Sequence, residues 1–223
     1  MRYTKAHKQH TRRQILEAAT RAFRAKGLRG ISIPKLMGQV DLTHGGFYAH
    51  FKSKENLIAE ACAQGLIKSA ERLTASAGKA SPGDTLRTVV NAYLSPEHRD
   101  NPAGGCVIPS LAGELSRESD GVRRAFTLAL ERYVAQLTPL LPTSSTQAPD
   151  DAVLALVAGM AGGILLARAV DDPTLSDRIL RACREFYLDA CAASDGRRAA
   201  DEPPRADTQG KARTQRSSDR RRA

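Results

Sequence analysis

Apolar residues recur along most of the chain at intervals of three and four positions, which is the spacing of one face of an α-helix. The pattern is clear in residues 11–26, where Ile15, Ala18, Ala22 and Phe23 fall on one side. No segment alternates convincingly between apolar and polar residues, so we expect no strands and an all-α fold. Helices are expected at 11–26, 34–40, 44–50, from 54 to about 70, from 82 to 93, and at 106–116, 120–140, 150–170 and 174–193, with a polar loop at 95–105.

Two of the expected helices are very short and adjacent. Residues 34–40 and 44–50 are separated by a turn of three residues, which predicts a helix-turn-helix. Ser32 and Thr43 have side chains that can cap the two helices. Helices this short need tertiary packing to persist. We expect a small core to hold them, formed by Phe23, Leu36, Val40, Phe47 and Phe51.

The outer face of the second short helix has an unusual composition. His44 and Tyr48 stand four positions apart and share a face that differs from the one carrying Phe47. Gly45 and Gly46 have no side chains, so the backbone there can approach a large partner closely. An exposed helix of this kind is a candidate for entering the major groove of DNA.

The formal net charge of +10 is concentrated at the two ends of the chain. Residues 1–30 hold nine Lys and Arg against one acidic residue, and residues 196–223 hold nine against four. Residues 61–195 hold thirteen against sixteen. Basic ends point to a polyanionic partner, most commonly nucleic acid, although solubility alone would also explain them.

Other features argue against several classes of protein. Residues 152–170 are apolar over nearly a membrane-spanning length, but they are rich in Ala and Gly and include Arg168, so we interpret them as a buried helix. No signal-peptide pattern opens the chain, so we expect a cytoplasmic protein without a membrane partner. The four cysteines lack metal-ligand spacing, and no catalytic motif is present. We therefore expect no metal, no cofactor and no catalytic residue.

Residues 11–62 resemble the DNA-binding domain of the TetR (tetracycline repressor) family of bacterial transcription factors. The resemblance rests on Ala-Ala and Phe in the first helix, a Gly-x-x-Gly turn, and the motif Phe-Tyr-x-His-Phe-x-Ser-Lys-Glu-x-Leu at residues 47–57. It implies a homodimer on a pseudo-palindromic double-stranded DNA operator, released by a small-molecule inducer of unknown identity. The expected organisation is a basic arm (1–10), an N-terminal three-helix helix-turn-helix domain (11–56), a helical ligand-binding and dimerisation domain (57–193) and a disordered basic tail (194–223).

By position, the resemblance assigns DNA contacts to eight residues of the helix-turn-helix domain. They are Ser32, Thr43, His44, Gly45, Gly46, Tyr48, His50 and Lys54. The hydroxyl and ammonium groups in this set suit phosphate contacts, and His44 is the best candidate for reading a base edge. The chain departs from the family pattern at Asp41, His44 and Gly46, where Gly, Lys, and Thr or Asn are common. The resemblance therefore does not predict the operator sequence.

Apolar residues between positions 82 and 170 could line a ligand pocket or simply form the core. Both interpretations fit the pattern, and core packing is favoured for most of these residues. The candidates are Leu86, Val90, Tyr93, Leu111, Leu115, Phe126, Leu130, Tyr133 and Leu137.

Cys106 suggests a second way of sensing. It follows Gly104 and Gly105 and begins a predicted helix, whose N-terminus favours a thiolate. We expect the two glycines to leave the thiol open to small reagents. The stretch from Gly105 to Leu115 also resembles a TetR-like subgroup that includes sensors of reactive electrophiles. The alternatives to a ligand-released repressor are thus an electrophile- or redox-sensing repressor acting through Cys106, and a non-specific DNA-binding protein.

The last two expected helices are candidates for dimerisation. Ala155, Gly159 and Gly163 form a stripe of small residues, and Ile179 and Phe186 share one face of the final helix. We expect both helices to pair with their copies in a four-helix bundle. The alternative is that the stripe packs within its own subunit.

Overall fold

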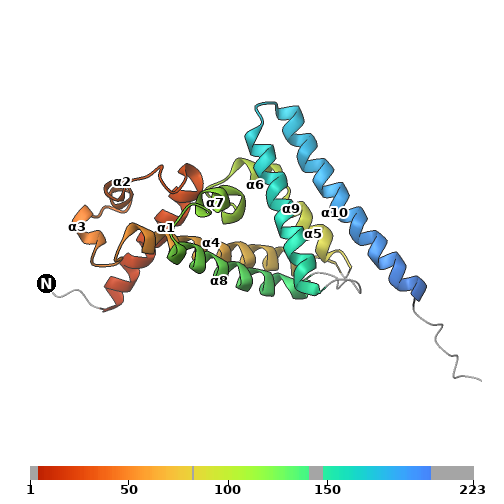
Figure 1. Ribbon diagram of the computed structural model, residues 1–223, viewed down its shortest axis with the longest axis horizontal. Helices are drawn as coiled ribbons and strands as arrows, with labels where there is room; N and C mark the ends of the chain where they lie inside the picture. Colours follow the sequence, from red (N-terminus) through yellow and green to blue (C-terminus); the bar gives the residue numbers. More distant parts are fainter. Residues whose placement is uncertain (1–4, 82, 141–147, 202–223) are drawn as a thin grey trace, which may run out of the picture.

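The computed structural model describes residues 5–81, 83–140 and 148–201, with side chains as far as Asp189. Within these ranges the regular structure is helical and contains no strand, so the all-α prediction is confirmed. Figure 1 shows short helices gathered into a head at one end and a long antiparallel helix pair at the other. Residues 1–4, 82, 141–147 and 202–223 lie outside the described residues.

The head consists of α1 (Lys5–Lys26), α2 (Ile33–Gly38) and α3 (His44–Phe47). α1 begins six residues before its predicted start at residue 11, because residues 5–10 continue the helix as an exposed basic extension. The expected N-terminal arm is therefore helical from Lys5 onward. α3 ends at Phe47 rather than at residue 50, and Tyr48 forms its C-cap.

Two turns of the head use the left-handed backbone region. α1 stops at Gly27, where φ is 78°, a conformation that glycine adopts without steric cost. The turn between α2 and α3 places Asp41 at φ 55°. Aspartate tolerates this region better than most other residues, which explains how this chain manages without the glycine that the family commonly has there.

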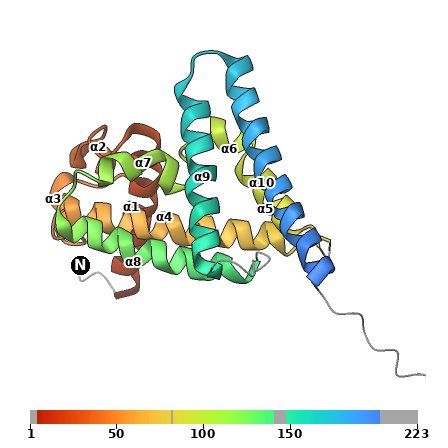
Figure 2. The ribbon, with the colours of Figure 1, turned by 45° about the vertical axis from the view of Figure 1, so that its right-hand side comes forward.

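The long helix α4 (Lys54–Ala77) connects the head to the rest of the molecule. It begins as expected, with the Ser53 side chain accepting a hydrogen bond from the Asn56 N–H at 3.1 Å. α4 packs on α1 near its start and runs beside α8 (Asp120–Leu137), as Figures 1 and 2 show. The frame formed by α4 and α8 therefore carries the head at one end.

Three shorter helices follow. α5 (Thr85–Tyr93) and α7 (Val107–Leu115) pack against α4, whereas α6 (Pro96–Asp100) packs against α9 (Pro149–Ala169). The prediction of an uninterrupted loop at 95–105 was wrong, because α6 forms inside it. Ser95 caps α6 by accepting from the His98 N–H at 3.2 Å, and Pro96 occupies the first turn. A helix of five residues shows too few apolar positions for periodicity to reveal it.

The far end of the molecule is an antiparallel pair, α9 (Pro149–Ala169) and α10 (Pro173–Asp201), which follows a short 3-10 turn, η1 (Thr138–Leu140). α9 is long and apolar enough to cross a membrane by length and composition, and 44% of its apolar 18-residue window is buried inside the structure. It packs against α7, α8 and α10, so one side of α9 belongs to the core. α10 continues to Asp201, so the first part of the expected disordered tail is helical.

Candidate DNA-binding and ligand sites

The candidate recognition helix α3 is held in place by its cap and by two aromatic rings. Thr43 acts as the N-cap, and its hydroxyl accepts from the Gly46 N–H at 3.3 Å. The rings of Phe47 and Phe51 stack with centroids 5.7 Å apart, and both are buried. Phe23 and Leu36 are also buried, and Val40 packs partly buried against the same cluster.

The opposite side of α3 faces solvent. His44 and Tyr48 meet edge to face with ring centroids 5.8 Å apart, and Tyr48 is 63% exposed. A Cβ added to Gly45 would meet no atom within 4 Å, and Gly45 has no positive φ. Neither internal packing nor backbone conformation therefore requires glycine there. The shared exposed face of His44 and Tyr48 agrees with the sequence pattern.

Several predicted DNA contacts have partners inside the head. The Ser32 hydroxyl accepts from the Lys35 N–H at 3.4 Å and caps α2. The Lys54 ammonium donates to the Ile31 carbonyl at 3.1 Å, so it ties the start of α4 to the turn before α2. His50 is half-buried, and its burial, with the positive charge of the neighbouring basic residues, lowers the pKa of its imidazole.

Arg12 is a structural residue of the head that the sequence pattern did not reveal. Its guanidinium contacts Glu60 at 2.7 Å, lies 4.5 Å from the centroid of the Phe51 ring, and donates to the His50 carbonyl at 3.3 Å. These partners are 38 to 48 positions away along the chain, so local spacing could not signal them. These contacts of Arg12 fix His50 and Phe51, which follow α3, relative to α1 and α4.

The part of the molecule beyond the head contains a half-open cleft of about 240 Å³ between α4, α5, α6 and the loop before α7. We call it the cleft. Its lining combines hydroxyl, imidazole, amide, carboxylate, thiol and guanidinium groups with apolar atoms, which form the larger part of its surface. The lining residues are Ser69, Arg72, Leu73, Ser76, Ala92, Tyr93, Ser95, Glu97, His98, Asn101, Gly104, Gly105 and Cys106.

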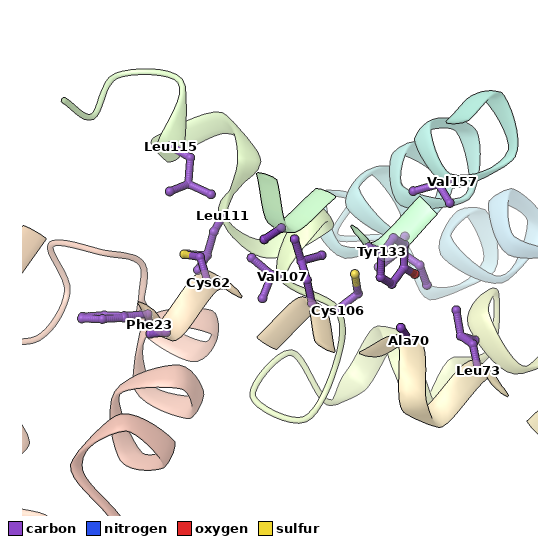
Figure 3. Close-up of a cluster of buried hydrophobic side chains, with 14 of the residues drawn as sticks. Phe23, Cys62, Ala70, Leu73, Cys106, Val107, Leu111, Leu115, Tyr133 and Val157 are labelled. Atoms are coloured by element: carbon purple, nitrogen blue, oxygen red, sulfur yellow. The ribbon is translucent and has the colours of Figure 1, made fainter. Parts of the chain in front are cut away.

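Only Tyr93 and Cys106 of the predicted pocket residues line the cleft. Tyr133 is buried close to Cys106, whose sulfur lies on the Tyr133 side in Figure 3. Phe126 is partly buried and packs against the core instead. The aliphatic candidates lie in the hydrophobic core or pack against it, so their helical spacing reflects packing between helices. They are Leu86, Val90, Leu111, Leu115, Leu130 and Leu137.

The expectation of an open Cys106 thiol was wrong. Cys106 stands at the N-cap of α7 as predicted, but it is only 1% exposed. The two preceding glycines make room for neighbours rather than for reagents. A Cβ at Gly104 would lie 2.6 Å from the Asn101 amide nitrogen, and one at Gly105 would lie 2.7 Å from the His98 ring.

His98, which the sequence placed in a polar loop, organises the wall of the cleft. Its Nδ1 lies 2.7 Å from the Tyr93 carbonyl oxygen, and its Nε2 lies 2.9 Å from the backbone nitrogen of Cys106. A carbonyl only accepts, so Nδ1 carries the proton and Nε2 accepts from the Cys106 N–H. Burial lowers the pKa of His98 to about 4. The charges of three neighbouring arginines act in the same direction, whereas the hydrogen bond to the Tyr93 carbonyl opposes the shift. The ring is therefore neutral at pH 7.

The wall of the cleft is joined directly to the head. Arg24, a buried residue of α1, donates to the Gly105 carbonyl, and the Arg72 guanidinium reaches the same oxygen at 3.2 Å. At the other end of α7, Glu114 accepts from the Leu28 N–H at 2.9 Å, just after α1. In Figure 3, buried side chains continue from Phe23 in the head through α7 to α9. α7 thus contacts both the cleft and the head.

Comparison with known families identifies both halves of the chain. The model for bacterial regulatory proteins of the tetR family matches residues 15–61, which cover the head. The model for the tetracyclin repressor-like C-terminal domain matches residues 82–183. The chain belongs to the TetR family.

Relatives of this TetR-family protein include a transcriptional repressor and a transcriptional regulator. The HTH-type transcriptional repressor DhaR of Mycobacterium sp. (strain GP1) is 26% identical over 184 residues, which cover 79% of this chain and 92% of DhaR. The HTH-type transcriptional regulator TtgR of Pseudomonas putida is 38% identical over 58 residues, 26% of this chain and 28% of TtgR. The crystal structure of reduced Escherichia coli NemR shares the fold, with a TM-score of 0.66 and 21% identity over 79% of this chain and 94% of NemR.

Because the chain belongs to the TetR family, its general activity is transcriptional regulation through DNA binding. Proteins of the family are soluble regulators that bind operator DNA as dimers and respond to small-molecule ligands. Within the described residues, no group of three or more His, Cys, Asp and Glu side chains is placed to hold a metal ion.

The predicted dimer stripe of this TetR-family chain faces inward at two of its three positions. A Cβ at Gly159 would collide with the Tyr187 side chain, and one at Gly163 would lie 3.0 Å from the Cys183 sulfur, both on α10. These glycines therefore let α9 and α10 of one subunit approach closely, as the alternative interpretation held. Ala155 is exposed, Ile179 is partly buried against the core, and Phe186 is 67% exposed.

Large apolar side chains nevertheless remain exposed on the α9–α10 pair. Leu154, Leu165 and Leu166 on α9 are 42%, 53% and 57% exposed. Leu175 and Phe186 on α10 are 39% and 67% exposed. A helix that is apolar on two sides normally has both sides covered, so α9 and α10 present a surface that suits a partner.

Proposed function

We propose that this chain is a repressor that binds a pseudo-palindromic operator as a homodimer and leaves it when a small molecule occupies the cleft. The observation that carries the DNA-binding part is the bare, exposed backbone of α3 at Gly45, flanked by His44 and Tyr48. A side chain at that position would be free of internal clashes, so close approach by an external partner explains the glycine. Its place at the start of a helix, where free N–H groups point outward, suits DNA phosphate.

The dimer is proposed to form through the exposed apolar surfaces of α9 and α10 rather than through the glycine stripe. Leu154, Leu165 and Leu166 of each copy would pack against Leu175 and Phe186 of the other or against their own counterparts. Two-fold symmetry would set the heads side by side, with their recognition helices separated by roughly one turn of DNA, about 34–36 Å. Such a protein would act in the cytoplasm.

A selection experiment tests the DNA-binding part. The full-length protein selects operator sequences from a random library, and its affinity for the selected DNA and for unrelated DNA is measured at one salt concentration. We expect a preference of at least about 10³-fold and a site with two inverted halves. Equal affinity for all sequences would support the non-specific DNA-binding alternative instead. His44→Ala should relax the preference, whereas Tyr48→Phe should weaken binding to all sequences equally.

The burial of Cys106 supports a reversible ligand rather than chemical modification of the thiol. Compounds that release the selected operator should therefore compete with one another and wash out on dialysis. Persistent release after dialysis, lost in Cys106→Ser, would instead support the electrophile-sensing alternative.

A further inference from the structure

Three arginines converge on the wall of the cleft without an acidic partner among the described residues. Arg24 and Arg72 both donate to the Gly105 carbonyl. Arg168 donates to two backbone carbonyls of α6, at 2.7 and 2.9 Å, and to a serine hydroxyl at 3.1 Å. All these acceptors are neutral, although Arg24 is buried and Arg168 is half-buried, and arginines removed from water are usually paired with carboxylates. Arg72 is exposed, so its guanidinium is open to a ligand that enters from solvent. The wall therefore carries an excess of positive charge, which the carboxylate of Asp100 offsets only at Arg168.

The titration of the neighbouring groups agrees with this charge excess. Burial, together with the charge of Arg72, lowers the pKa of Arg24 to about 10. Burial also lowers the pKa of Arg168, and the same arginines help to keep His98 neutral. An anion placed here would offset the lowering of the Arg24 and Arg168 pKa values, because it would favour the charged form of each guanidinium.

The region behind the wall also holds two buried hydroxyl groups. The hydroxyls of Tyr93 and Tyr133 make no well-formed hydrogen bond in the part of the chain that the structure describes, and the Cys106 thiol is a close neighbour of both. A buried hydroxyl without a partner is uncommon in folded proteins. Tyr93 lines the cleft, next to the hydroxyl-bearing Ser69 and Ser76. These hydroxyl groups can donate hydrogen bonds to the oxygen atoms of a ligand.

We propose that the inducer is a compact organic carboxylate, bound with its charged group against Arg72 and the donors of the cleft. This inference rests on the ligand-responsive function proposed above and names the chemical class of its ligand. The cleft volume of about 240 Å³ limits the ligand to a small molecule, such as one aromatic ring bearing a carboxylate. Glu97 lies exposed at the mouth of the cleft and opposes an anion only weakly, because a surface charge is screened by water and salt.

The carboxylate would be sensed by the head through Arg24. A hydrogen bond from a guanidinium to a carboxylate is stronger than one to a neutral carbonyl. A carboxylate near the Gly105 carbonyl would therefore compete for Arg24 and Arg72, which now share that oxygen. Arg24 belongs to α1, so its displacement changes how the head is attached to α7.

A panel of matched pairs tests the ligand class. Benzoate, phenylacetate and 4-hydroxybenzoate are each compared with the primary amide of the same shape, using the thermal midpoint of the full-length protein and release of the selected operator. We expect at least one acid to raise the midpoint saturably and to release DNA, while its amide does neither. Arg72→Gln should weaken binding of that acid about tenfold or more, because a charge-assisted hydrogen bond is lost.

Two further variants serve as controls. Arg123→Gln removes an exposed arginine that pairs with Asp120 at 3.5 Å, away from the cleft lining, and should leave acid binding unchanged. Glu97→Gln removes the negative charge at the mouth and should tighten acid binding about two- to threefold. Equal binding of acids and amides, no binding by any acid, or full acid binding by Arg72→Gln would overturn the proposal.

The same measurements separate this inference from the proposed function. Operator selectivity is measured first, without any acid. Selective operator binding combined with no preference for acids would refute the ligand class alone. Acid binding that depends on Arg72, combined with no operator selectivity, would refute the proposed repressor function and leave the ligand class supported.

Discussion

Substitution of Gly45 by alanine should change stability and DNA affinity in opposite directions. Alanine is favoured over glycine inside helices by about 1 kcal/mol, and we expect about half of this because Gly45 lies in the first turn of a four-residue helix. The added methyl group meets no atom of the protein within 4 Å, so no internal clash offsets the gain. For a chain of this size, about 0.5 kcal/mol raises the thermal midpoint by roughly 1–2 °C. On DNA, the methyl group would hold the backbone away from its partner and weaken binding about tenfold, which is about 1.4 kcal/mol.

Gly38→Ala is the matched control for this experiment. Gly38 ends α2, has no positive φ, and offers the same open space to an added methyl group. Calorimetry should show both variants at or above the wild-type midpoint. Fluorescence anisotropy with the selected operator at fixed salt should show a loss for Gly45→Ala only. Unchanged operator affinity of Gly45→Ala, with the expected rise in stability, would refute the idea that the α3 backbone touches DNA.

Three other outcomes follow from the structure. The pKa of His98 is about 4 in the folded chain and ordinarily 6.5, so the unfolded chain binds an extra proton between these pH values. The free energy of unfolding should therefore fall by about 1.4 kcal/mol per pH unit as the pH drops through that window. Urea unfolding should show this fall for wild type but not for His98→Gln, and parallel pH profiles would contradict it. Phe186→Glu places a charge on the exposed α9–α10 surface and should give a monomer at micromolar concentration in sedimentation, with weaker operator binding; a persistent dimer would locate the interface elsewhere. Because Cys106 is buried, treatment with a quinone should affect operator binding of wild type and Cys106→Ser equally, and a larger loss for wild type would restore the sensing hypothesis.

The head was predictable from sequence because its determinants are local. Ser32, Thr43 and Ser53 cap the helices that directly follow them, and Phe47 and Phe51 stack one helical turn apart. Each of these relations spans four residues or fewer, which is the range over which capping and periodicity act. The bounds were less accurate, since α1 begins earlier and α3 ends sooner than the apolar pattern indicates.

The ligand site was not predictable in the same way because its contacts join distant segments. Arg24 meets Gly105 across 81 positions, and Leu28 meets Glu114 across 86. Apolar periodicity identified core residues such as Leu111 correctly but does not tell which of them border a cleft. The glycines before Cys106 were misinterpreted for a related reason, because the side chains that fill the space beside them come from α6 and its end.

The hydrogen bond from Arg24 to the Gly105 carbonyl limits how freely the domains of this protein can be exchanged with those of its relatives. Engineers often exchange DNA-reading and effector-sensing modules between regulators to connect a new signal to a chosen promoter. Here such an exchange at the start of α4 would separate a donor from its acceptor, since Arg24 lies in one module and Gly105 in the other. A hybrid that receives a different residue at position 24 should still bind the operator of its new head but respond poorly to the effector. Restoring arginine at that single position should recover the response.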